Sequence, residues 1–213
     1  MKNLRKVWGV KLGSKELVKE GYQLGMAQEN EEILELTEFL SDKNLYNIME
    51  IGSKNGGTFY IFSKLATGKK ISLDLPGSIH GGWTLNEHPY LGNVADKRNK
   101  WFEDNFDDVH MILADSHNQN TFSIVESRLG GELLDFLMVD GDHTYEGVKQ
   151  DYEMYKQLVK PGGYIAFHDV NDTEYHRKRD VYVSKLWEEL DGEKIEFNNN
   201  THWAGIGVIK NVE

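Results

Sequence analysis

Two polar segments carry residue types that bind metal ions and move protons. Asp140-Gly141-Asp142-His143 follows the apolar run 134–139, and His168-Asp169 ends a second apolar run that starts at residue 164. Carboxylate oxygens and imidazole nitrogens together suit Mg²⁺, Mn²⁺ or a related divalent ion. We therefore expect Asp140, His168 and Asp169 to bind a metal. The alternative is that Asp140 and Asp169 only contact a cofactor or cap helices.

His143 follows Asp140 by three residues, where the next helix is expected to begin. An unperturbed imidazole has a pKa of about 6.5, which suits taking a proton at neutral pH. We expect His143 to be a catalytic base. The alternative is a hydrogen-bonded histidine with a structural role.

A glycine-spaced turn follows the earlier apolar run that ends in Glu50-Ile51. Glycine lets the backbone approach a ligand, and a helix that opens at Gly57 presents its amide groups to a negative group. We expect this turn to bind a nucleotide-like cofactor; a tight turn without a ligand is the alternative. The residues expected to contact the cofactor here are Glu50, Gly52, Ser53, Gly56, Gly57 and Thr58.

Two further acids lie at the ends of apolar runs. Asp74 follows 71–73, about twenty residues after the glycine turn, where a carboxylate suits the two hydroxyls of a ribose. Asp115 and Ser116 follow 112–114 and are expected to contact the base of the same nucleoside. Asp140 is expected to contact this cofactor as well as the metal. For Asp74 and Asp115 the alternative is helix capping or a turn.

The elements that position these residues alternate between strands and helices. Their strands lack in–out alternation, as expected when helices cover both faces of a mostly parallel sheet. The last two strands follow each other without a helix, so they predict an antiparallel C-terminal hairpin. We expect an α/β, doubly wound, seven-stranded sheet, with ligands at the carboxyl ends of its strands. The expected strands are 47–51, 70–75, 109–114, 134–139, 164–168, 194–197 and 203–209, and the expected helices are 28–40, 57–66, 95–106, 121–129, 145–159 and 181–190.

Composition excludes several classes of protein. The net charge is −11 with scattered basic residues, which argues against nucleic-acid binding. There is no cysteine, so thiolate metal sites and disulfides are excluded. No apolar run approaches the roughly 20 residues of a membrane helix, so we expect a cytoplasmic protein without membrane contact. We interpret the basic tract 176–179 as a solvated turn, with contact to an anionic substrate as the alternative.

We divide the chain into an N-terminal extension and helix, 1–44, and a main domain, 45–213. Apolar residues in the extension, Val7, Trp8, Val10 and Leu12, suggest the hypothesis of a homodimer. The irregular stretch 76–94 is long for a compact domain and is expected to border the substrate. The candidates on the substrate side are His80, Trp83, His88 and Trp203.

Residues 45–210 resemble a class I S-adenosylmethionine-dependent methyltransferase, which implies a Rossmann-like sheet. Glu50-Ile51-Gly52 with Gly56-Gly57-Thr58 resembles the first motif of that family, and Asp74 its second-strand acid. The stretch 140–148, with 158–163 and 168–170, is similar to a subgroup that includes sugar O-methyltransferases and cephalosporin-hydroxylase-like proteins. The resemblance implies methyl transfer from S-adenosylmethionine to a hydroxyl of a small polar acceptor.

In metal-dependent members of that subgroup, an acid after the fourth strand and two adjacent ligands after the fifth bind Mg²⁺. The resemblance places these roles on Asp140, His168 and Asp169, and the role of base on His143. His168 replaces the commoner acid at its position. Two alternatives remain: a non-catalytic cofactor-binding protein, and an NAD-dependent oxidoreductase, whose loop normally reads Gly-x-Gly-x-x-Gly.

Overall fold

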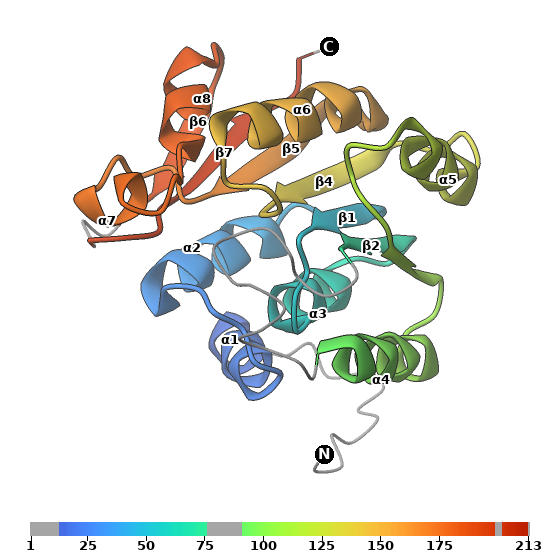
Figure 1. Cartoon of the computed structure of the whole chain (residues 1–213). Helices are drawn as coiled ribbons and strands as arrows, with labels where there is room; N and C mark the ends of the chain where they lie inside the picture. Colours follow the sequence, from blue (N-terminus) through green and yellow to red (C-terminus); the bar gives the residue numbers. More distant parts are fainter. Residues whose placement is uncertain (1–12, 76–90, 199–201, 213) are drawn as a thin grey trace.

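The computed structural model describes residues 13–75, 91–198 and 202–212, and it places a seven-stranded sheet at the centre of the chain (Figure 1). The strand order is β3-β2-β1-β4-β5-β7-β6. The five strands from β3 to β5 are parallel, while β7 lies antiparallel to both β5 and β6. The predicted doubly wound sheet with an antiparallel C-terminal edge is thus confirmed. The strands are β1 Ile48–Ile51, β2 Lys70–Asp74, β3 Val109–Leu113, β4 Leu134–Val139, β5 Val159–His168, β6 Lys194–Phe197 and β7 Ile206–Lys210.

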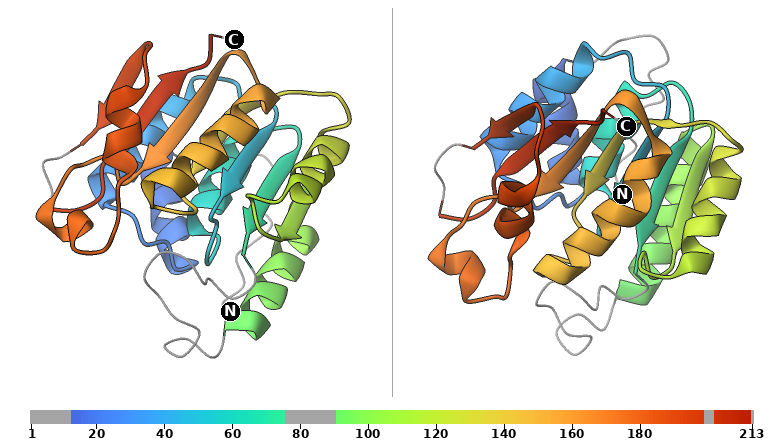
Figure 2. Two further views of the ribbon diagram at one scale, coloured as in Figure 1. Left: turned by 45° about the horizontal axis from the view of Figure 1, so that its top comes forward. Right: turned by 90° about the horizontal axis from the view of Figure 1, so that it is seen from above.

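Helices cover both faces of the sheet (Figure 2). On one face, α1 to α4 pack through residues such as Leu36, Phe59 and Phe102. On the other face, α5, α6 and α8 pack through Val125, Val148 and Trp187, for example. The helices are α1 Ser14–Gln23, α2 Asn30–Ser41, α3 Gly57–Leu65, α4 Leu91–Asn105, α5 Gln119–Leu129, α6 Tyr145–Tyr155, α7 Glu174–Arg177 and α8 Val183–Glu189, with a 3₁₀ turn at Lys156–Leu158.

Several boundaries differ from the sequence prediction, and the largest difference is at the start of β5. The sixth helix ends at Tyr155 instead of 159, and β5 begins at Val159 instead of 164. Pro161, Gly162 and Gly163, which precede the predicted strand 164–168, lie inside β5. The pairing with β4 shifts register between Leu134 and Phe136, and this irregularity accommodates the proline and glycines.

The N-terminal segment packs on the domain. Helix α1, which the sequence did not predict, buries Leu17, Val18 and Gly21. A Cβ on Gly57, the first residue of α3, would lie 2.5 Å from the carbonyl oxygen of Gly21, so the two backbones are in close contact. The residues behind the homodimer hypothesis, Val7, Trp8, Val10 and Leu12, lie outside the described residues, as do His80, Trp83 and His88. Among the described helices, none is both long and apolar enough to cross a membrane.

Candidate functional site

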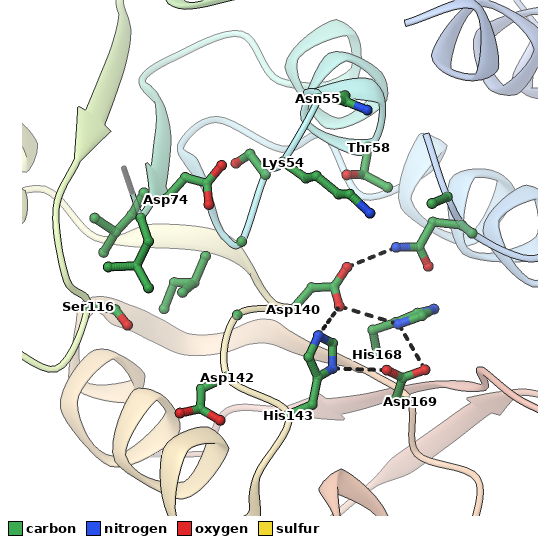
Figure 3. A pocket seen from close by; sticks show the side chains of 18 of the residues that line it. Lys54, Asn55, Thr58, Asp74, Ser116, Asp140, Asp142, His143, His168 and Asp169 are labelled. Atoms are coloured by element: carbon green, nitrogen blue, oxygen red, sulfur yellow. Dashed lines mark hydrogen bonds and ion pairs between the residues drawn. The ribbon is translucent and has the colours of Figure 1, made fainter. Parts of the chain in front are cut away.

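A cavity of about 640 Å³ opens at the carboxyl ends of the parallel strands, and Figure 3 shows its side chains. The sheet brings most of the predicted site residues to this one cavity. Those that line it are Gly52, Ser53, Gly57, Thr58, Asp74, Asp115, Ser116, Asp140, His143, His168, Asp169 and Trp203. Glu50 and Gly56, which we also expected to contact the cofactor, are not among its lining residues.

Gly52 lets the loop after β1 pass directly against the loop after β4. Its φ is 89°, and a Cβ there would lie 2.0 Å from the carbonyl oxygen of Asp140. The amide of Asp140 donates to Ile51 O at 2.9 Å, which holds the two loops together. Any side chain at this position would therefore push apart the two loops that form the centre of the cavity.

Gly56 has a clear role in packing. It is the residue before α3, with φ 87°, and a Cβ there would lie 2.6 Å from the Phe102 ring of α4. The absence of a side chain at Gly56 therefore allows α4 to pack on the glycine turn.

Asp74, at the end of β2, is held by an arginine that the sequence did not indicate. Arg98 of α4 contacts Asp74 Oδ2 through Nη1 at 2.7 Å and also donates to the carbonyl oxygen of Lys54. Both side chains of the pair are largely buried, with exposures of 5% and 12%. Arg98 thus ties the tip of β2 to the glycine turn and fixes the carboxylate that faces the cavity.

The β4 and β5 ends bring two carboxylates and two imidazoles together, as Figure 3 shows. His168 Nδ1 lies 3.3 Å from Asp140 Oδ1 and 3.2 Å from Asp169 Oδ1. His143 Nδ1 lies 2.9 Å from Asp169 Oδ2, and its Nε2 lies 3.9 Å from Asp140 Oδ1. Asp140, His143 and Asp169 each offer a ligand atom within 4.8 Å of the others. The arrangement has the donor types and spacing to bind a cation.

The side chains of this cluster shift one another's pKa values. Burial alone would raise the pKa of the Asp169 carboxyl, but the neighbouring His168 and hydrogen bonds from the surrounding histidines hold it well below its usual range. Burial would lower the pKa of the His143 imidazole, but the hydrogen bond to Asp169 and the charge of Asp140 raise it. Asp169 also adopts φ 64°, a strained conformation of the kind that occurs at functional sites.

None of the acids that line this cavity caps α5, α6 or α7. The caps of α5, α6 and α7 are the side chains of Asn118, Thr144 and Thr173. Asp115 instead accepts from the amide of His117 at 2.9 Å, in a local turn. Asp140 and Asp169 therefore remain available for a ligand.

Two residues that the sequence did not indicate complete the cluster. Gln28, from the loop between α1 and α2, donates through Nε2 to Asp140 Oδ2 at 2.9 Å. His176 of α7 is buried, with Nε2 3.2 Å from Asp169 Oδ1. Its Nδ1 lies 2.7 Å from Asn171 O, which can only accept, so Nδ1 carries the proton. The interpretation of 176–179 as a solvated turn is thus wrong for His176.

The other three residues of that basic tract are exposed. Two of them form ion pairs, and the third packs on an aromatic ring. Arg177 pairs with Asp172 at 2.5 Å and Lys178 with Glu174 at 2.6 Å. Arg179 instead lies over the Tyr175 ring, 3.6 Å from its centre, and both residues line the cavity.

The loop after β3 is anchored to α6 by two contacts that the sequence did not indicate. Tyr155 Oη donates to Ser116 O at 2.9 Å, and His117 Nε2 lies 3.3 Å from Asp151 Oδ1. Asp151 is completely buried, and its hydrogen bond to His117 raises the pKa of that imidazole. These contacts position Asp115 and Ser116 at the cavity wall.

Glu50, like Gly56, does not line the cavity, and it is fully buried in β1. Burial raises the pKa of its carboxyl to about 8, although the Thr58 hydroxyl opposes the shift. A carboxyl with this pKa stays protonated at neutral pH, because burial disfavours its charged form.

This shift predicts a pH-dependent effect of Glu50→Gln on stability. Between pH 4.5 and about 8 the folded state binds more protons than the unfolded state at this position, so wild-type stability falls as pH rises. The slope is at most about 1.4 kcal/mol per pH unit. Glu50→Gln should therefore raise the melting temperature most at about pH 9 and hardly at all near pH 4.5. Glu35→Gln, on the exposed side of α2, should show no such trend; equal pH profiles for both variants would contradict the assignment.

Comparisons with known proteins identify the family of this chain. The model of the family described as "Methyltransferase domain" matches residues 49–170. An uncharacterised protein of Acanthamoeba polyphaga mimivirus is 31% identical over 86 residues, which is 40% of this chain and 38% of that protein. The match thus spans well under half of the mimivirus protein.

Solved structures show the same fold at low sequence identity. The O-methyltransferase TomG from Streptomyces achromogenes, in complex with SAM, has a TM-score of 0.60 at 10% identity over 94% of this chain and 90% of that one. An O-methyltransferase from Bacillus cereus, in complex with SAH, has a TM-score of 0.58 at 14% identity over 96% and 94%. The chain therefore belongs to the methyltransferase domain family, with the fold of class I S-adenosylmethionine-dependent methyltransferases.

Proposed function

We propose that this protein transfers a methyl group from S-adenosylmethionine to a hydroxyl of a small polar acceptor. The observation that carries the proposal is that one cavity joins the glycine turn and Asp74 to the histidine–carboxylate cluster. The first group suits a nucleoside and the second suits activation of a hydroxyl. The fold shared with O-methyltransferases that were solved with SAM and SAH supports the choice of cofactor.

The cofactor half of the cavity has the parts that a nucleoside with a charged tail requires. Gly52 and Gly57 expose backbone, and the first turn of α3 presents free amide groups. Asp74, fixed by Arg98, would accept hydrogen bonds from the ribose hydroxyls. Asp115 and Ser116, held by Tyr155, would contact the base.

The reaction is an in-line displacement in which positioning supplies much of the acceleration. The acceptor oxygen forms a bond to the methyl carbon as the carbon–sulfur bond breaks, which leaves S-adenosylhomocysteine. The hydroxyl proton passes to His143. Because Asp169 Oδ2 accepts from Nδ1 at 2.9 Å, the proton of His143 is held there and Nε2 is left to take the new one.

Asp140, His168 and Asp169 would hold a divalent ion beside His143. Their fit to an ion is supported by the carboxylates of Asp140 and Asp169, which offer oxygen donors within 4.8 Å of each other. A bound ion would orient the acceptor hydroxyl and lower its pKa. Trp203, fixed by a 2.7 Å hydrogen bond to Glu29, and Tyr175 with Arg179 would border the acceptor.

Calorimetric titration with S-adenosylhomocysteine and with NAD tests the cofactor directly. We expect saturable binding of the first and no binding of the second. Binding of NAD alone would exclude methyl transfer in favour of an oxidoreductase. Labelled methyl transfer to a panel of sugars and phenols then tests turnover; cofactor binding without transfer to any hydroxyl would favour a non-catalytic binding protein.

A further inference from the structure

We propose that the acceptor carries an oxyanion, a carboxylate or a phosphate, and that Arg179 binds it through its guanidinium. The inference rests on the proposed function and deepens it, because it names the class of acceptor for the same cavity. It applies to Arg179 the alternative that the sequence left open for 176–179, contact with an anionic substrate.

The charge of Arg179 is not balanced by a carboxylate in the described part of the chain. Arg177 and Lys178, the neighbouring cations of the tract, each form an ion pair with a nearby acid. Arg179 instead donates through Nη1 to Tyr175 O at 3.3 Å. A guanidinium has five N–H groups, so most of its donors remain available to a ligand.

The Tyr175 ring limits how this cation can lie. Arg179 Cζ is 3.6 Å from the ring centre, which is a close cation–π contact. A guanidinium packed on a ring still offers the N–H groups at its edge, and their flat fork matches two oxygens of a carboxylate or phosphate. The contact with Tyr175 therefore prepares the side chain for an oxyanion, because part of the cost of ordering it is met before the ligand binds.

Backbone contacts hold Arg179 beside the histidine–carboxylate cluster. Its amide donates to His176 O at 2.8 Å, and His176 is buried against Asp169. Three residues further along the chain, the amide of Tyr182 donates to His143 O at 2.8 Å. The segment that carries Arg179 is thus anchored on both sides to residues of the cluster. An oxyanion bound there would hold the rest of the acceptor near the proposed base.

Arg179 lies where two hollows of the surface meet. It lines the main cavity, as does His143. It also lines an adjoining hollow of about 410 Å³, together with Thr173, Glu174, Tyr175, Lys178 and His202. Lys178 pairs with Glu174 at 2.6 Å, so the charge of this acid is balanced and Arg179 leaves the hollow with an excess of positive charge. An acceptor could therefore place its hydroxyl in the main cavity and its anionic group at Arg179.

The acids of the main cavity would orient such an acceptor. Five aspartates line that cavity, namely Asp74, Asp115, Asp140, Asp142 and Asp169. They repel an anionic group, whereas Arg179 attracts it, and both effects act at short range in a partly enclosed site. The anionic end of the acceptor is thereby directed away from the cofactor half of the cavity.

Matched acceptors test the proposal. Each is offered as a neutral alcohol, a carboxylate and a phosphate, as in glucose, glucuronate and glucose 6-phosphate, or in hydroxybenzyl alcohol, hydroxybenzoate and hydroxybenzyl phosphate. We expect labelled methyl transfer to an anionic form with a kcat/KM at least about tenfold above that of its neutral counterpart. The ranking of the two anionic forms identifies the oxyanion. Calorimetric titration of the S-adenosylhomocysteine complex with each anionic form and with inorganic phosphate measures binding independently of turnover.

Arg179→Gln removes the charge and should raise KM for the preferred anionic form at least about tenfold, with little change in kcat. The neutral form should be unaffected, whereas a merely structural defect would impair both forms. Arg179→Lys keeps the charge without the flat fork and should be intermediate. Arg177→Gln is the matched control, because it removes the same charge from the same tract but Arg177 lines neither hollow. It should behave as the wild type, and retained affinity for S-adenosylhomocysteine shows that each variant is folded.

Three outcomes would overturn the proposal. They are equal kcat/KM for neutral and anionic forms, equal losses in Arg177→Gln and Arg179→Gln, and no binding of any anionic form or of phosphate to the wild type. If neutral acceptors are methylated without preference for an anion, the proposed function stands and only the inference on Arg179 fails. If S-adenosylhomocysteine does not bind, the proposed function itself fails.

Discussion

Gly52→Ala is expected to abolish measurable binding of S-adenosylhomocysteine and to lower the melting temperature. A Cβ would lie 2.0 Å from Asp140 O and 2.4 Å from Asp140 C, and neither backbone atom can turn away as a flexible side chain would. The loops after β1 and β4 must therefore separate, which moves Ser53 and Asp140 at the centre of the cavity. Calorimetric titration and thermal unfolding measure the two effects.

Gly162→Ala is the matched control for this prediction. Gly162 has φ 81°, close to the 89° of Gly52, but a Cβ there would meet nothing within 4 Å. Gly162→Ala should lower the free energy of unfolding by only about 1–2 kcal/mol, the strain of an alanine in the left-handed conformation. The affinity for the cofactor should be unchanged. If both variants bind the cofactor equally well, close contact between the two loops is not what the site requires.

His143→Ala is expected to reduce kcat for methyl transfer by about 10² to 10⁴, the usual contribution of a general base. The affinity for S-adenosylhomocysteine should change little, because His143 is not among the residues that we expect to contact the cofactor. Asp169 and Asp140 raise the pKa of the His143 imidazole, so wild-type activity should rise with pH through a midpoint above 6.5 as the base loses its proton.

The pH profile separates a base from a structural histidine. The residual activity of His143→Ala should lack the rise near neutral pH, and His110→Ala should retain both the rate and the profile of the wild type. Unchanged turnover in His143→Ala, with the same dependence on pH, would remove this residue from the mechanism.

The strands and their ends were predictable because topology alone determines them. Apolar runs such as Ile48–Ile51 are buried on both faces, and parallel strands end at a common edge, so Asp74, Asp140 and Asp169 had to gather there. The start of β5 was not predictable, because Pro161 and Gly162 normally interrupt a strand and only the shifted pairing with β4 accommodates them.

The supporting residues were harder to foresee. Three of these residues come from helices or loops whose positions depend on tertiary packing, and a lone arginine or histidine gives no periodic signal; they are Arg98, His117 and His176. Helix α1 was missed for a related reason. Its contact with α3 uses Gly21, whose lack of a side chain weakens the apolar pattern on that face.

Gln28 changes how the chain can be divided. We separated 1–44 from the main domain, yet this glutamine reaches the carboxylate of Asp140, and Gly25, Met26 and Ala27 form part of the cavity wall. A variant truncated to begin at β1 would therefore lose one wall of the cavity and expose Asp140 to bulk water. Work on a minimal catalytic unit should retain the polypeptide from α1 onward.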